Sequence, residues 1–98
     1  MRFDHVAICV ECIQESVEWY CKELDAALEY RDETWAMLKI GDHKVALILG
    51  DLHPPHIAFS VSDIQSVAHI SEVKSHRDGS KFIYKKDPSG NIIEILQY

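Results

Sequence analysis

The stretch HVAICVECIQ at residues 5–14 returns as HIAFSVSDIQ at residues 56–65, and this repeat decides the fold. The two copies are identical at five positions, which carry His, Ala, Val, Ile and Gln. Each copy begins with a histidine, His5 or His56, on an alternating apolar run that leads into a helix start. An internal repeat indicates two similar structural modules. We therefore expect a pseudo-twofold axis that relates the two histidines, and a site that both share.

Outward from each copy, the sequence predicts the same order of elements, βαβββ. In the first half we expect a strand at 3–10, an amphipathic helix at 13–24 and strands at 28–31, 34–40 and 44–49. In the second half we expect a strand at 56–61, a short helix, a weak edge strand within 71–80, and strands at 81–86 and 91–97. Asp63 is the expected cap of the short helix, whose apolar positions are Ile64, Val67 and Ala68.

The predicted fold class is therefore α+β, with two βαβββ modules whose mixed sheet curls into a cup. Module 1 spans about 1–51 and module 2 about 54–98, and no flexible linker separates them. A chain of 98 residues suits one small domain, so we expect both modules to share a single domain over residues 1–98.

The charge balance and the cysteine count restrict the partners and the compartment. The net charge is −6 and the pI is near 5.4, which argues against nucleic acid or an anionic membrane surface as a partner. The apolar runs are too short to span a bilayer. Three cysteines without an export signal are typical of reduced thiols, so we expect a cytoplasmic protein.

One carboxylate interrupts the last apolar strand of the second half. The repeat places VALIL at 45–49 over IIEIL at 92–96, which sets Glu94 against Leu47. A buried carboxylate is costly unless it is paired or binds a metal. Of the four positions that the pseudo-twofold relates, His5, Leu47, His56 and Glu94, three can bind a metal.

These residues resemble the vicinal oxygen chelate superfamily, which includes glyoxalase I, extradiol dioxygenases, methylmalonyl-CoA epimerase, and the fosfomycin and bleomycin resistance proteins. The matching segments are FDHVA at 3–7, SVEWY at 16–20, HIAFSV at 56–61 and DPSGNIIEI at 87–95. The resemblance implies the glyoxalase-like fold, a divalent metal (Fe, Mn, Ni or Zn) as cofactor, and His5, His56 and Glu94 as its ligands.

The chain also departs from the family pattern. Glyoxalase I has a fourth ligand, a glutamate, where this chain has Leu47, so the resemblance does not imply glyoxalase chemistry by that route. Three ligands look more like the extradiol dioxygenases or the fosfomycin-modifying thiol transferases. Cys12 replaces the usual helix-capping Asp, and Asp25 replaces the Gly that usually follows the first helix. The second helix and the region before Lys81 are shorter than usual, which trims the substrate-binding surface.

Alternation and the resemblance together predict what else faces the cup. Tyr84 matches a tyrosine near the phosphonate in the fosfomycin-resistance proteins and is our candidate catalytic residue, with a half-buried strand aromatic as the alternative interpretation. The expected cavity-lining residues are Cys9, Ser60, Leu47, Trp35, Met37, Phe82 and Lys86.

The remaining cysteines and histidines have simpler interpretations. Cys9 and Cys12 have CxxC spacing, but no second pair completes a zinc site, so we expect a small buried Cys9 and an incidental Cys12. Predicted turns and polar faces carry four histidines that we interpret as surface residues: His43, His53, His69 and His76.

The resemblance implies a small metal-dependent enzyme that chelates and activates a small oxygen-rich substrate by lyase, thiol-transferase or dioxygenase chemistry. One alternative is a metal-free binding protein like the bleomycin-resistance proteins, and another is a regulatory dimer with a vestigial site. Small members commonly dimerise, so we expect a homodimer. Pairing of modules between chains would place His5 of one chain beside His56 and Glu94 of the other.

Overall fold

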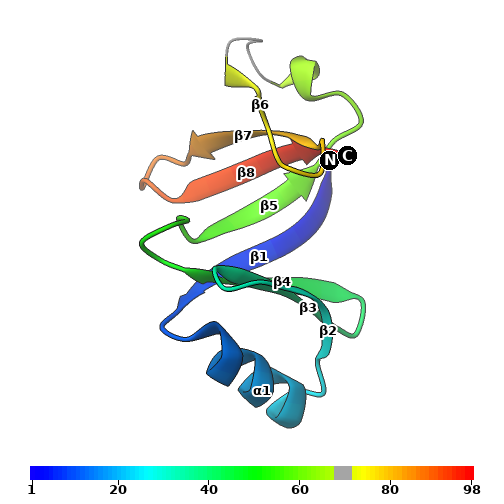
Figure 1. Ribbon diagram of the computed structural model, residues 1–98. Helices are drawn as coiled ribbons and strands as arrows, with labels where there is room; N and C mark the ends of the chain where they lie inside the picture. The colour runs from blue at the N-terminus through cyan, green and yellow to red at the C-terminus, as the bar shows by residue number, and fades with distance from the viewer. Residues whose placement is uncertain (68–71) are drawn as a thin grey trace. The chain divides into compact units, whose positions relative to one another are not determined.

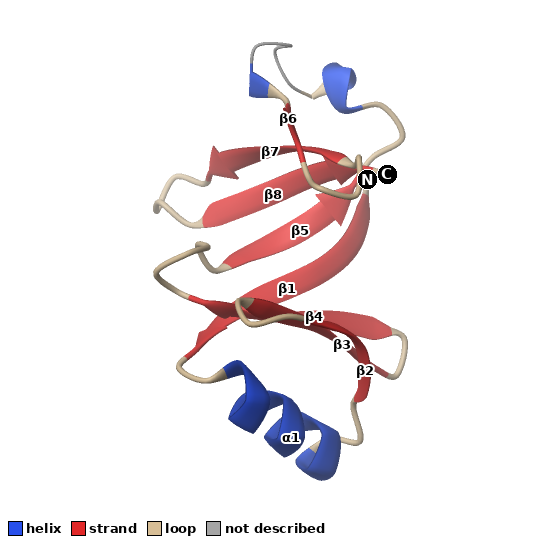
Figure 2. Ribbon diagram, viewed as in Figure 1, coloured by secondary structure: helices blue, strands red, loops and turns tan. Residues whose placement is uncertain are grey.

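The structure is a computed structural model that describes residues 1–67 and 72–98. Within these residues the chain forms eight β-strands and one α-helix, which confirms the α+β fold class (Figure 2). The chain divides into two compact units, His5–Pro55 and His56–Tyr98, with Met1–Asp4 belonging to the second. Among the described residues, no helix has the length and apolar character needed to cross a membrane.

The first unit has the predicted βαβββ order. Its elements are β1 (Arg2–Val10, from His5 onward), α1 (Ile13–Glu23), β2 (Ala27–Arg31), β3 (Trp35–Ile40) and β4 (His43–Leu49) (Figure 1). The strands lie in the order β2-β3-β4-β1, and β1 and β4 run parallel while the other neighbours are antiparallel.

Helix α1 covers one face of this sheet and forms the core of the first unit. Ile13 and Val17, one turn apart on the helix, pack on three sheet residues, Ala36, Leu38 and Leu47. The helix ends before Asp25, which has a left-handed backbone (φ 55°). That conformation favours Gly, the residue expected there from the resemblance, because a side chain is strained in it.

The second unit repeats the order with shorter elements. They are β5 (His56–Ser60), the 3-10 turn η1 (Ile64–Ser66), β6 (Lys74–Ser75), β7 (Lys81–Lys86) and β8 (Ile92–Gln97). The strands lie in the order β5-β8-β7-β6, and β5 and β8 run parallel. Ile64, Ile83 and Ile95 form its core on one face of the sheet.

Where the second helix was predicted, the described residues form the 3-10 turn η1. Asp63 caps it as expected, because its side chain accepts a hydrogen bond from the backbone N–H of Gln65 (3.1 Å). Ala68, which we expected on this helix, and the surface position His69 lie outside the described residues.

A tight turn joins β7 to β8 and determines how the last strand begins. The Asp87 carboxylate accepts hydrogen bonds from the backbone N–H groups of Ser89 (2.9 Å) and Asn91 (2.8 Å). Gly90 has φ 87°, which this turn requires. With the turn defined in this way, Tyr84 on β7 lies opposite Glu94 on β8.

Candidate metal centre

Glu94 is a buried carboxylate in the middle of β8, with 3% of its surface exposed. Its neighbours Ile93 and Ile95 point to the opposite face, where they pack in the isoleucine core. Glu94 therefore shares its own face with its partners across the strands, Ala58 on β5 and Tyr84 on β7. The acid is flanked on both sides by apolar residues of the strand, as the sequence indicated.

His56, the first residue of β5, reaches this carboxylate within the second unit. The distance from His56 Nε2 to Glu94 Oε1 is 3.6 Å, and the two side chains are 7% and 4% exposed. This distance is too long for a good hydrogen bond. Two ligand atoms that are each about 2.1 Å from one metal ion lie roughly 3.0–3.5 Å apart. The pair is therefore spaced much as two ligands of one metal ion.

His76 contacts the other oxygen of the same carboxylate. Its Nε2 lies 3.2 Å from Glu94 Oε2, and its ring stacks on Phe82 with ring centroids 3.8 Å apart. We expected His76 to be a surface residue, and 39% of its side chain is exposed, but the sequence did not indicate its contact with Glu94. The one available signal was its place in the turn before a strand whose Phe82 and Tyr84 were expected to face the site.

Tyr84 and Phe82 extend this face along β7. The Tyr84 ring centroid lies 5.7 Å from that of His56 and 5.3 Å from that of Phe82. Burial of the phenol, together with the negative charge of Glu94, raises the pKa of Tyr84 to about 12. Tyr84 is thus a neutral hydrogen-bond donor near pH 7, and it is 38% exposed.

His5 lies on β1 and belongs to the first unit, where it is buried with 8% of its surface exposed. The strand alternates, so His5 and Ala7 share a face, and Ala7 packs with Ala46 and Ile48. Asp4, the residue before His5, belongs to the second unit, where its Oδ2 accepts a 2.7 Å hydrogen bond from the Tyr98 hydroxyl.

The strand register shows that the counterpart of Glu94 in the first unit differs from the residue predicted from the sequence. In the first unit Ala7 pairs with Ala46, and in the second unit Ala58 pairs with Glu94. Because Ala7 and Ala58 are equivalent in the repeat, the counterpart of Glu94 is Ala46 and not Leu47. Leu47 points to the opposite face and is fully buried against α1, so it does not line the histidine face. Uniformly apolar strands hide such a slip, because a shift by one residue leaves them equally apolar.

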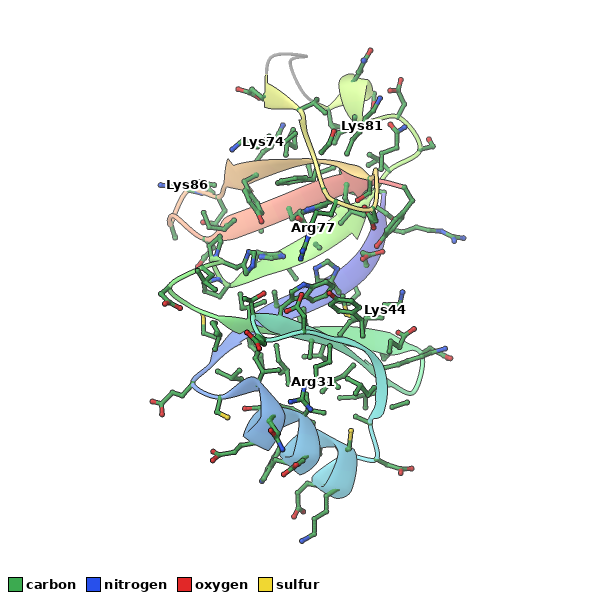
Figure 3. All side chains as sticks on the ribbon, viewed as in Figure 1. Arg31, Lys44, Lys74, Arg77, Lys81 and Lys86 are labelled. Carbon is green, nitrogen blue, oxygen red and sulfur yellow. The ribbon has the colours of Figure 1, made fainter. Side chains whose placement is uncertain are left out.

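The other expected cavity residues have different surroundings. Trp35 and Met37 pack on the Ala7 cluster, on the same face of the first unit as His5. Cys9 was expected to be buried and is exposed. In the second unit Ser60 is half-buried, and Lys86 is exposed at the end of β7 (Figure 3).

A family model described as the Glyoxalase/Bleomycin resistance protein/Dioxygenase superfamily matches residues 2–71. No curated protein matches the chain by sequence.

Several solved structures are similar in fold. Methylmalonyl-CoA epimerase from Mycobacterium tuberculosis is 20% identical, with a TM-score of 0.77 over 98% of this chain and 87% of that chain. A glyoxalase/bleomycin resistance protein/dioxygenase superfamily member from Vibrio splendidus 12B01 is 16% identical, with a TM-score of 0.73 over 95% of each chain. A Streptomyces coelicolor methylmalonyl-CoA epimerase in complex with 2-nitronate-propionyl-CoA is 21% identical, with a TM-score of 0.68 over 99% of this chain and 96% of that chain. At these identities the likeness shows the fold.

Proposed function

Because this chain belongs to the Glyoxalase/Bleomycin resistance protein/Dioxygenase superfamily, we propose that it is a metal-dependent enzyme acting on a small oxygen-rich substrate. The proposed ligands are His5, His56 and Glu94, each of which offers one ligand atom and is buried or half-buried. The observation that carries the proposal is the buried Glu94 carboxylate, whose Oε1 lies 3.6 Å from His56 Nε2. Imidazole nitrogens and a carboxylate oxygen are a donor set that Fe, Mn, Ni and Zn accept.

A divalent metal bound there supplies a Lewis acid for two neighbouring substrate oxygens and for the negative charge that develops on them. Tyr84 serves as a neutral hydrogen-bond donor that orients a substrate oxygen, because its raised pKa keeps the phenol protonated. Phe82 contacts the Tyr84 ring in a T-shaped arrangement and supports its position on that face. Lyase, thiol-transferase, dioxygenase and, from the similar solved structures, epimerase reactions all fit this chemistry.

The test is the metal content of protein produced without a His-tag. Wild type and the variants His5→Ala, His56→Ala and Glu94→Ala are loaded separately with Mn²⁺, Fe²⁺, Ni²⁺ and Zn²⁺ and analysed by mass spectrometry. We expect stoichiometric metal in wild type and strong losses in all three variants. His43→Ala is the matched control, because His43 is exposed at the start of β4. Equal and negligible metal in all five proteins refutes the proposal and favours a metal-free binding protein.

The identity of the preferred metal then narrows the reaction. Fe²⁺ favours oxygen chemistry, whereas Ni²⁺, Mn²⁺ or Zn²⁺ favours isomerisation or addition. An enzyme that prefers Fe²⁺ is expected to consume oxygen with a catechol-type substrate in an oxygen-electrode assay. Retention of Zn²⁺ or Ni²⁺ without oxygen consumption supports the isomerase, lyase or transferase group.

We also propose that residues 1–98 act as one glyoxalase-like domain, and that the protein is a cytoplasmic homodimer with a small-molecule substrate. If modules pair between chains, His5 of one chain serves a site with His56 and Glu94 of the other. Light scattering coupled to size-exclusion chromatography measures the mass. A monomeric mass with metal still bound removes the dimer.

A further inference from the structure

We propose that His76 is a positioning residue that holds the Glu94 carboxylate and so raises the affinity of the site for its metal. This inference rests on the proposed function, because it assigns a role beside the proposed ligand Glu94. The assignment depends on contacts within the second unit alone: His76 Nε2 lies 3.2 Å from Glu94 Oε2, while His56 Nε2 lies 3.6 Å from Oε1.

The backbone fixes where the His76 ring begins. His76 follows β6, and its N–H donates to the Ser80 carbonyl (2.8 Å) while its carbonyl accepts from the Gly79 N–H (3.0 Å). The Asp78 carboxylate closes the same turn by accepting from the Ser80 N–H (2.9 Å) and the Ser80 hydroxyl (2.6 Å). These hydrogen bonds fix the backbone at His76, which restricts how far its imidazole can move from the Glu94 carboxylate.

Stacking fixes the direction of the ring. The His76 and Phe82 rings are nearly parallel (9°), with centroids 3.8 Å apart. Phe82 lies two residues before Tyr84, which is the cross-strand partner of Glu94, so Phe82 and Glu94 share one face. The imidazole lying on Phe82 is therefore directed along this face, and its Nε2 meets Oε2.

The two carboxylate oxygens thus have separate partners. An Nε2–H of His76 that donates to Oε2 satisfies that oxygen and leaves Oε1 toward His56, the residue with which it would share a metal. Removal of His76 leaves a buried carboxylate oxygen without this donor, which is costly and allows the group to rotate. Partners of this kind around a ligand typically contribute about 10–100-fold in metal affinity.

The first unit offers an internal comparison. By the strand register Trp35 is the counterpart of Phe82 and Ala46 is that of Glu94. A ring packs on Trp35 as well, but it is the phenol of Tyr30, with centroids 4.6 Å apart. The chain thus places an imidazole on this aromatic platform in the module that has the carboxylate, and a phenol in the module that has alanine.

The test measures metal affinity by calorimetry and the coordination of Co²⁺ by its visible absorption. We expect His76→Ala to weaken Zn²⁺ and Co²⁺ binding by about 10–100-fold. His76→Gln keeps an N–H donor at the same reach and should recover much of the loss, and Phe82→Leu should lie between. The Co²⁺ band positions should stay as in wild type, because the ligands are unchanged. His43→Ala is the matched control and should bind as wild type does.

Each result has one meaning. If wild type binds metal and His76→Ala binds it equally well, the inference on His76 is wrong while the proposed function stands. If the Co²⁺ bands of His76→Ala shift, His76 is a ligand and the positioning role is wrong. If wild type itself binds no metal, the proposed function fails, and this inference fails with it. Because His76 and Phe82 are only half-buried and His43 is exposed, all variants are expected to fold, which circular dichroism verifies.

Discussion

Replacement of Glu94 by glutamine should leave the metal-free protein nearly as stable as wild type and remove its stabilisation by metal. Glutamine keeps the shape of the side chain and can still accept from His76, but it has no negative charge. The imidazoles of His56 and His76 can both be neutral, so the substitution leaves no buried charge unpaired. It exchanges one charge-assisted hydrogen bond for a neutral one, which should lower the free energy of unfolding by about 1 kcal/mol.

The metal-bound state separates the two proteins. A metal present at about 100 times its Kd stabilises wild type by about 2.7 kcal/mol. In a chain of this size, about 1 kcal/mol shifts Tm by roughly 4–8 °C, so metal should raise the wild-type Tm by roughly 11–22 °C. The Glu94→Gln protein loses an anionic ligand and should shift by only a few degrees at the same metal concentration.

Thermal unfolding followed by circular dichroism measures both effects, with EDTA in one set of samples and excess Zn²⁺ or Mn²⁺ in the other. Glu29→Gln is the matched control, because it removes the same charge from an exposed position on β2. A wild-type Tm that does not respond to metal, or an equal response in Glu94→Gln, would refute the reasoning. If Glu94→Gln lost several kcal/mol of unfolding free energy in EDTA, the charge of Glu94 would be stabilising the metal-free protein, contrary to the first expectation.

Three further predictions concern stability. Leu47→Ala should lower the free energy of unfolding by about 2–5 kcal/mol in urea titrations, because Leu47 is fully buried against α1. A loss below about 1 kcal/mol would contradict this burial and would favour the cavity-lining position expected from the sequence. Burial opposes ionisation of Asp32, yet hydrogen bonds from Tyr30 and the following backbone amides lower its pKa. The contribution of Asp32 to the free energy of unfolding is therefore complete above about pH 4 and is lost as the pH falls further. Wild type and Asp32→Asn should thus converge in stability in acid, as urea titrations at several pH values measure. Asp25→Val should cost about 1–2 kcal/mol, whereas Asp25→Gly should not, because the backbone there is left-handed; equal costs would contradict this.

Most of the elements and their order were predictable from the sequence because two periodicities repeat. Alternating runs defined the strands, and helical spacing defined α1 to within one residue of its observed end at Glu23. The proposed ligand Glu94 could be picked out for a similar reason, since a charged residue stands out in an otherwise apolar run. Where the pattern was uniform it carried less information, and the counterpart of Glu94 was placed at Leu47 instead of Ala46.

His76 could not be found from periodicity, because it belongs to a turn that follows a strand of only two residues, Lys74–Ser75. Its role depends on a contact across 18 residues, from the turn to Glu94, and on the ring of Phe82 beneath it. The turn brings the His76 ring onto Phe82, and the register of β7 with β8 places Glu94 on the same face. A pattern that covers single segments does not contain them.

The cost of burying charge explains why the polar groups gather in one module. Glu94 is 3% exposed and is accompanied in its own unit by His56, His76 and Tyr84. A second carboxylate at Ala46 would need partners of its own, and the position across the strand from Ala46 carries Met37, which offers no donor. We therefore expect only one of the two modules to carry a buried carboxylate on this face. On this reasoning the first module is expected to supply a single ligand, His5, and the second to supply the charge and the groups that orient it.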